Sequence, residues 1–239
     1  MNEMTEGHTV EKYNSELEHL HQLVLKMGGL VQDQICRAVR TLEDEDVEQA
    51  RLVVDRDQKI DQLDVQADEE IIRLIAKRQP VARDLREVLA VQKIVSDLER
   101  IGDQARRLAR LTLLFYEGDN SPPNYRLIND IPKLSNLVAG MLESALTAFD
   151  KLDPMLALEV IRADAELDEE MRSALRRLST YLMEDSRSVG HVVDIAIGLR
   201  AVERIGGHTK YIANHTIFLI TGKDVRHNSL EEVTAEVMD

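Results

Sequence analysis

The chain repeats part of its own sequence. The tetrapeptide Glu-Arg-Ile-Gly starts at Glu99 and starts again at Glu203, 104 residues later. Apolar residues recur every three or four positions around both copies, over residues 94–115 and 202–219. That period places one face of a helix against a core. The duplication therefore predicts two similar helical units in one chain.

The same period predicts three helices in each half. Strand signals are nearly absent, because no run alternates β-branched and polar residues and no Asn-Gly or Asp-Gly turn occurs. Pro80 is expected to separate two helices, and Gly222 to end the last one. The expected helices cover residues 10–42, 47–77, 81–116, 126–150, 154–184 and 189–221. The predicted fold class is all-α, with two tandem, similar three-helix bundles.

A turn-rich segment divides the halves. Residues 117–124 read Glu-Gly-Asp-Asn-Ser-Pro-Pro-Asn, which is typical of a linker. We expect a first bundle with a short N-terminal tail over 1–118, a linker over 119–125, and a second bundle with a short C-terminal tail over 126–239. The Gly28-Gly29 pair interrupts the first helix. A close helix crossing is the favoured interpretation, and a contact with a partner is the alternative.

Charge and cysteine content limit the partners and the compartment. The chain carries 30 basic and 44 acidic residues, for a net charge of −14. That balance disfavours binding to nucleic acid or to anionic lipid, and suits cations or basic protein surfaces. The single Cys36 cannot form an internal disulfide, the N-terminus lacks a signal-peptide core, and no apolar run is long enough to span a bilayer. A cytoplasmic protein without membrane insertion is expected.

Acidic side chains in the first half suggest a cation site. Asp57 and Asp61 are four residues apart on the expected second helix, and Glu99 and Asp103 are four apart on the third. Like charges at this spacing repel each other. Antiparallel packing would bring both pairs to one level, and we expect them on the outside of the bundle. Oxygen ligands of this kind favour hard divalent ions. A solvated acidic face is the alternative.

The second half carries a reduced version of this set. Its equivalents are Asp164, Asp168 and Glu203, while Gly207 stands where the first half has Asp103. We therefore expect a weaker or absent second site. His208 is adjacent but is turned by about 100° around the helix, which disfavours it as a replacement ligand.

Other polar clusters have simple explanations. His208, Tyr211 and His215 share a helix face; a solvated surface is favoured over a site for a softer metal. A basic cluster at the turn after the second helix suits the helix dipole and solubility, and a docking patch is the alternative. The cluster consists of Lys77, Arg78, Arg83 and Arg86.

Catalytic motifs are not found. The sequence contains no Gly-x-Ser-x-Gly, no Walker lysine loop and no dinucleotide-binding glycine pattern. Glu16-x-x-His19 matches one piece of a di-iron bundle, but the required second Glu-x-x-His does not occur. We therefore do not expect an enzyme. A metal-dependent bundle enzyme, a metal-storage protein and a purely structural bundle are the alternatives.

Several segments together resemble one known family. They are Met27-Gly28-Gly29, Ala76-Lys-Arg-Gln-Pro80, Asp84-Leu-Arg86, Asp97-Leu-Glu-Arg-Ile-Gly-Asp103, Tyr181-Leu-Met-Glu-Asp185, Glu203-Arg-Ile-Gly206 and Gly222-Lys-Asp-Val-Arg-His227. In this order they resemble the PhoU family of phosphate-transport accessory proteins. The resemblance implies a cytoplasmic homodimer that negatively regulates the phosphate-starvation response. It also implies two partners, the ATPase subunit of the phosphate importer and a sensor histidine kinase.

The resemblance further implies metal binding, because some family members hold metal clusters through Glu/Asp-x-x-x-Asp pairs. The divalent metal would be Mg, Mn, Fe or Zn. Gly207 departs from the family pattern and suggests a divergent regulatory output. The implied ligands are Asp57, Asp61, Glu99 and Asp103 in the first site, and Asp164, Asp168 and Glu203 in what remains of the second.

Overall fold

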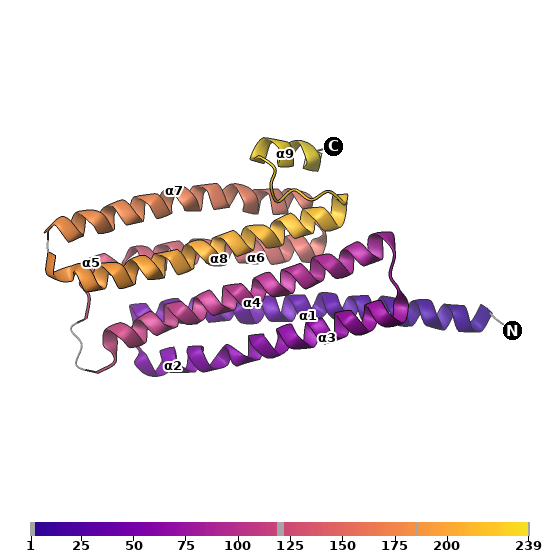
Figure 1. Cartoon of the computed structure of the whole chain (residues 1–239), viewed down its shortest axis with the longest axis horizontal. Coiled ribbons are helices and arrows are strands. Elements are labelled where there is room, and N and C mark those ends of the chain that lie inside the picture. The colour runs from indigo at the N-terminus through magenta and orange to yellow at the C-terminus, as the bar shows by residue number, and fades with distance from the viewer. Residues whose placement is uncertain (1–2, 119–121, 185, 239) are drawn as a thin grey trace.

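The fold is two bundles of long helices lying side by side, as the computed structural model shows (Figure 1). It describes residues 3–118, 122–184 and 186–238, and every regular element in these ranges is a helix. The prediction of an all-α chain with two tandem three-helix bundles is confirmed. The first bundle contains α1 (Glu3–Glu43), α2 (Val47–Arg56), α3 (Gln58–Arg78) and α4 (Ala82–Tyr116). The second contains α5 (Tyr125–Ile128), α6 (Asp130–Lys151), α7 (Pro154–Glu184) and α8 (Val189–Thr221), followed by α9 (Leu230–Met238).

Side-chain caps set where several helices begin. The Asp46 carboxylate accepts a hydrogen bond from the Gln49 backbone N–H at 3.0 Å at the start of α2. Asp153 accepts from the backbone N–H groups of Met155 and Leu156 at the start of α7. These bonds satisfy backbone donors that have no partner within the helix. A local signal also sets where α8 ends. Gly222 takes a left-handed conformation with φ of 82° and ends the helix as expected.

Three expected helix boundaries are wrong. The first helix begins at Glu3, so residues 3–9 are helical rather than a loose tail. The helix expected over 126–150 is divided at Asn129 into α5 and α6. The helix expected over 47–77 is divided at Asp57 into α2 and α3, where the Ile60 N–H donates to the Asp57 carbonyl at 2.8 Å. This bond spans three residues instead of four and tightens the turn locally.

The repeated glycine of Glu-Arg-Ile-Gly allows close helix packing inside each bundle. A Cβ on Gly102 of α4 would lie 3.0 Å from the Ile60 side chain of α3. A Cβ on Gly206 of α8 would overlap the Leu167 side chain of α7. Ile60 and Leu167 occupy equivalent places in the two halves, 107 residues apart. In both bundles, the glycine of the motif thus lies where the equivalent pair of helices comes close, and the approach is closer in the second bundle.

The two bundles meet through two pairs of helices. α4 packs along α8, and α1 packs along α6 (Figure 1). A Cβ on Gly28 of α1 would lie 2.5 Å from Leu146 of α6, so the expected close crossing at Gly28 is confirmed. No atom lies within 4 Å of the corresponding position on Gly29 in the described structure. The interface therefore passes on one side of the glycine pair only.

The expected linker between the two bundles is described only in part. Residues 119–121 of the expected linker lie outside the described residues, and Asn124 caps α5 by accepting from the Arg126 N–H at 3.0 Å. The domain bounds 1–118 and 126–239 stay a prediction. Among the described helices, none combines the length and the apolar character that crossing a membrane requires.

Candidate functional site: two acidic clusters and the interface between bundles

Two carboxylates that we expected on the outer surface are buried. Asp57 is 1% exposed and Asp164 is 7% exposed. The expectation of an outward position is therefore wrong for both residues. Each buried carboxylate pairs with a cation from the third long helix of its own bundle. Arg106 of α4 pairs with Asp57, and Lys210 of α8 pairs with Asp164.

Arg106 joins two of the predicted metal ligands. Its Nη1 donates to Asp57 Oδ2 and its Nη2 donates to Asp103 Oδ1. The Gln34 amide of α1 donates to Asp57 Oδ1 at 2.8 Å and to the Gly102 carbonyl at 3.1 Å. Burial raises the pKa of Asp57 above its ordinary value, although Gln34 and Arg106 act in the opposite direction. Asp57 therefore connects four helices. It lies between α2 and α3 and accepts hydrogen bonds from Gln34 of α1 and Arg106 of α4.

The second half repeats this arrangement with different chemistry. Lys210 Nζ donates to Asp164 Oδ2 at 2.8 Å. Lys210 follows Arg106 by 104 residues and Asp164 follows Asp57 by 107, the same offsets that relate the two repeats. An internal cation facing a buried aspartate is therefore part of the duplicated plan. At Gly207, a Cβ would meet no atom of the described chain within 4 Å, so the place of Asp103 is open there.

The remaining predicted ligands do come near one another. Burial raises the pKa of Glu99, and the negative charges of Asp103, Asp64 and Asp61 raise it further. In the second half, burial and the charges of Asp164 and Glu203 raise the pKa of Asp168. Within each set, these carboxylates therefore lie close enough to raise one another's pKa. Asp61 and Asp168 are exposed, while Glu99, Asp103 and Glu203 are half-buried.

The acidic side chains of both sets are arranged around cationic side chains and not around a ready metal site. Within the described ranges, no group of three or more His, Cys, Asp or Glu side chains is placed to hold one. The reason is visible in the contacts: Arg106 engages Asp57 and Asp103, and Lys210 engages Asp164. The metal sites stay a prediction. Sequence reasoning missed both cations, although Arg106 follows Asp103 by three residues and so lies on the same helix face.

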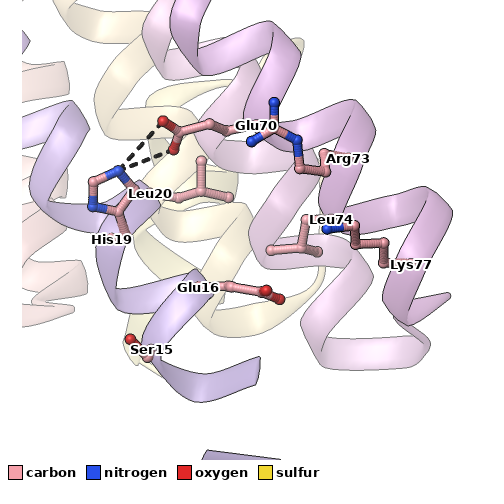
Figure 2. Close-up of a pocket in the computed structure, with 8 residues that line it drawn as sticks. All are labelled: Ser15, Glu16, His19, Leu20, Glu70, Arg73, Leu74 and Lys77. Atoms are coloured by element: carbon pink, nitrogen blue, oxygen red, sulfur yellow. Dashed lines mark hydrogen bonds and ion pairs between the residues drawn. The ribbon is translucent and has the colours of Figure 1, made fainter. Parts of the chain in front are cut away.

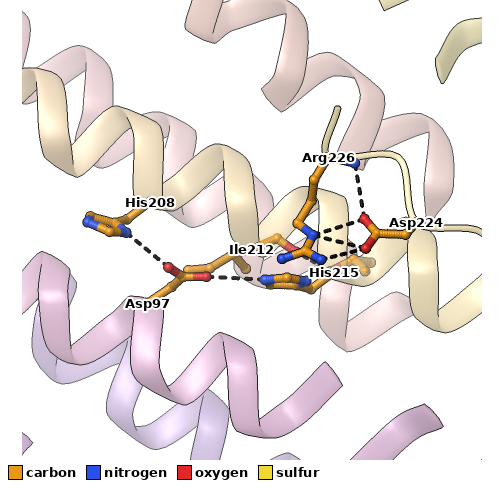
Figure 3. Close-up of polar contacts among 7 residues, drawn as sticks. Asp97, His208, Ile212, His215, Asp224 and Arg226 are labelled. Atoms are coloured by element: carbon orange, nitrogen blue, oxygen red, sulfur yellow. Dashed lines mark hydrogen bonds and ion pairs between the residues drawn. The ribbon is translucent and has the colours of Figure 1, made fainter. Parts of the chain in front are cut away.

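The histidines of α8 reach across to the first bundle (Figure 3). His208 Nδ1 lies 2.9 Å from Asp97 Oδ1, and His215 Nε2 lies 3.4 Å from Asp97 Oδ2. His215 is only 4% exposed, so the favoured solvated-surface interpretation of this face is wrong for it. Burial alone would raise the pKa of Asp97, but the hydrogen bonds and charges of the two histidines hold it below its ordinary value. Asp97 is thus a buried acceptor at the interface between bundles.

The four residues of the predicted basic cluster make different contacts. Lys77 lines a cleft of about 400 Å³ between α1 and α3, together with Arg73, Glu16 and the His19–Glu70 pair (Figure 2). Arg78 instead pairs with Glu16 through hydrogen bonds of 2.7 and 3.1 Å.

The other two members of the cluster lie apart from that cleft lining. Arg83 is exposed, and Arg86 is half-buried. The Arg86 guanidinium lies so close to Gly222 that a Cβ there would overlap it. Arg86, near the start of α4, therefore lies against the end of α8. The docking role of the four residues stays a prediction.

Comparison with known proteins matches both halves of the chain. The PhoU domain family matches residues 24–112 and residues 131–216. The phosphate-specific transport system accessory protein PhoU homolog of Pseudomonas putida is 41% identical over 230 residues, covering 96% of this chain and 89% of the relative. The phosphate-specific transport system accessory protein PhoU of Escherichia coli K12 is 34% identical over 226 residues, covering 95% of this chain and 92% of the relative.

Two solved structures share the fold. The crystal structure of PhoU from Pseudomonas aeruginosa matches with a TM-score of 0.82 and 41% identity, covering 88% of this chain and 100% of that chain. The phosphate transport system regulatory protein PhoU from Streptococcus pneumoniae matches with a TM-score of 0.80 and 26% identity, covering 89% and 99%. The family match covers both bundles and the relatives cover nearly the whole chain, so this chain belongs to the PhoU family.

Proposed function

We propose that this protein restrains phosphate uptake and the phosphate-starvation response when phosphate is plentiful. The observation that carries the proposal is the relationship over nearly the whole chain to proteins named as accessories of the phosphate-specific transport system. The matched regulatory protein from Streptococcus pneumoniae supports the same role. In this proposal the protein is a cytoplasmic adaptor and a homodimer. Its partners are the ATPase subunit of the phosphate importer and a sensor histidine kinase.

The proposed adaptor works by binding and not by catalysis. Its support is the way in which the buried acids are used: Asp57, Asp97 and Asp164 each face a basic or histidine side chain of another helix. Such pairs hold helices together, whereas a catalytic carboxylate needs an open approach for a substrate. A metal-dependent enzyme or a metal-storage protein is the alternative. Turnover of oxygen or of a phosphoester by purified, metal-loaded protein would favour that alternative.

A direct test of the role uses phosphate uptake by cells. The gene is deleted, and the rate of radioactive phosphate uptake is measured in phosphate-rich medium, with and without the gene restored on a plasmid. The proposal expects a higher uptake rate in the deletion strain and a return to the original rate on restoration. An uptake rate unchanged by deletion in phosphate-rich medium would contradict it.

Divalent cation binding is a further part of the proposal. Its support is the mutual repulsion around Glu99, which a cation would relieve. Any such ion competes with Arg106 for Asp103, because the guanidinium already occupies one carboxylate oxygen. The ion would be Mg²⁺, Mn²⁺, Fe or Zn, bound by Asp57, Asp61, Glu99 and Asp103. Asp164, Asp168 and Glu203 would form the weaker second site.

Calorimetric titration with Mn²⁺ tests this part. Asp103→Ala should weaken or abolish binding, and Arg106→Gln should strengthen it by removing the competing cation. Asp33→Ala is a matched control, because Asp33 lies on the exposed side of α1 and pairs with Arg37. Equal heats for wild type, Asp103→Ala and Arg106→Gln would show that the carboxylates bind no metal.

A further inference from the structure

One face of α8 exposes three apolar side chains in a row. Val189, Val193 and Ile197 follow one another at four-residue intervals and therefore lie along one line of the helix. Val193 is 53% exposed and Ile197 is 57% exposed. The stripe spans about 12 Å at 1.5 Å per residue, which is just over two helical turns.

The stripe borders a groove between the two bundles. The groove has a volume of about 490 Å³ and lies where α4, α7 and α8 meet. Its apolar lining includes Leu175 of α7 and the α8 residues Val193, Ala196 and Ile197. The chain's last helix does not use it, because α9 packs against α7 near Arg162, whose guanidinium donates to Thr234 at 3.5 Å. In the described chain, an apolar groove of this kind is left open to the surroundings.

Three arginines give the groove a positive rim. Arg107 of α4 and Arg200 and Arg204 of α8 all line it. Arg107 donates to the amide oxygen of Gln104, and Arg200 shares its charge with Glu203. Arg204 forms no ion pair with any described residue. The groove is therefore locally basic, although the whole chain has a net charge of −14.

The internal repeat shows that the two halves differ at part of this surface. By the 104-residue offset, the places of Ile197 and Ala201 on α8 correspond to Lys93 and Asp97 on α4. Those two are polar and are used within the molecule: Lys93 lies 5.6 Å from the centre of the Phe218 ring, and Asp97 contacts His208. On α8, Ile197 is 57% exposed, Ala201 is buried, and Val193 has an apolar counterpart in Leu89 of α4. The difference between the two halves at this surface therefore rests on Ile197.

We propose that this groove, lined by Val193, Ile197, Leu175 and the arginines 107, 200 and 204, docks an acidic amphipathic helix of a partner protein. Two turns of such a helix would place an apolar stripe on Val193 and Ile197. Its flanking Asp or Glu side chains would face the arginines, which pair with carboxylates in a two-pronged geometry. The apolar floor argues against a small anion as the occupant, and the positive rim argues for a partner of opposite charge.

The inference rests on the proposed function, which names the transport system as the partner. The probe is therefore the purified ATPase subunit of the phosphate importer from the same organism. Its affinity for the full-length chain is measured by biolayer interferometry at two salt concentrations. Two substitutions address the two features of the groove separately: Ile197→Asp removes the apolar contact, and Arg204→Glu reverses the rim charge.

Each substitution has a matched control outside the groove. Ile72→Asp places the same change at an exposed isoleucine of α3, which is 68% exposed. Arg110→Glu reverses an exposed charge on α4. We expect Ile197→Asp and Arg204→Glu each to weaken binding by about tenfold, and the controls to change it by less than about twofold. Arg204→Lys should keep more than half of the affinity and the salt dependence that Arg204→Glu loses.

The failures of the two proposals are distinguishable. If the wild type binds the subunit and both groove variants bind it equally well, the docking site is wrong and the proposed function stands. If the wild type does not bind the subunit, the transporter contact fails and the docking site fails with it. Sedimentation of each variant completes the test: loss of a wild-type dimer on Ile197→Asp alone would assign the groove to contact between two copies and overturn the proposal.

Discussion

Asp57 shows how a residue of an acidic repeat becomes part of a core. It lies in the apolar series Val53, Asp57, Ile60, at steps of four and three, and is therefore on the buried face of its helix. Asp164 lies in the same position between Val160 and Leu167. The spacing thus held a signal that both aspartates are buried. The cations that make burial tolerable come from another helix, so periodicity within one helix does not show them.

Removal of the Arg106 guanidinium should destabilise the protein. Arg106→Gln leaves Asp57 buried with only Gln34 as a donor, and a buried group that loses a partner costs about 1–3 kcal/mol in the free energy of unfolding. Urea unfolding measures this cost, with Arg110→Gln as the exposed control. Adding Asp57→Asn to Arg106→Gln should recover part of the loss. Equal stability of wild type and Arg106→Gln would contradict the structural role of the pair.

Glu99 should destabilise the protein at neutral pH in the absence of metal. Its folded-state pKa is raised by burial and by neighbouring carboxylates, so the folded state binds the proton more tightly than the unfolded state does. Glu99→Gln should therefore raise the free energy of unfolding at pH 7 by about 0.5 kcal/mol. The gain should shrink as the pH falls through the folded-state pKa of Glu99. A gain that grows with acidity would contradict the assignment.

At the scale of the element, local chemistry predicted some helices closely and missed others. Residues 154–184 and 189–221 were expected to be helical, and α7 and α8 have those bounds. Pro154 opens α7 and Gly222 ends α8, and both signals act within one turn of the chain. The division at Asp57 has no such local signal. Contacts from α1 and α4 hold Asp57 in place, and these contacts exist only once the bundle has formed.

Neighbouring glycines of α8 should respond oppositely to the same substitution. A Cβ on Gly206 would overlap Leu167, so Gly206→Ala forces α7 and α8 apart and should cost about 1–3 kcal/mol. A Cβ on Gly207 meets no described atom within 4 Å, so Gly207→Ala should stabilise the helix by up to about 1 kcal/mol. Thermal unfolding of the two variants decides this. A loss for both or a gain for both would contradict the close α7–α8 packing.

At the scale of the whole molecule, the two bundles are joined by polar as well as apolar contacts. Sequence reasoning predicted two bundles from the repeat, but it did not place them side by side with α4 on α8. The contact between Asp97 and the two histidines of α8 is 111 or more residues apart in sequence, so no local pattern indicates it. Asp97 nevertheless lies within the buried face formed by Ile94, Leu98 and Ile101.

The contribution of Asp97, at the interface between the bundles, to the stability of the protein should depend on pH. The folded-state pKa of Asp97 is below the ordinary 3.8, so its contribution to stability is complete above about pH 4 and is lost as the pH falls through the lower folded-state value. Asp97→Asn should be less stable than wild type at pH 7, and the difference should narrow below pH 4. Urea unfolding at pH 7, 4 and 3 measures it. A difference that stays constant down to pH 3 would contradict the assignment.

The central claim is that this chain holds the phosphate-starvation response off when phosphate is present. The most direct measurement is alkaline phosphatase activity in phosphate-rich medium, compared between the parent strain, a deletion strain, and the deletion strain carrying the wild-type gene. The account predicts high activity in the deletion strain and low activity in the other two. Low activity in all three strains would contradict it.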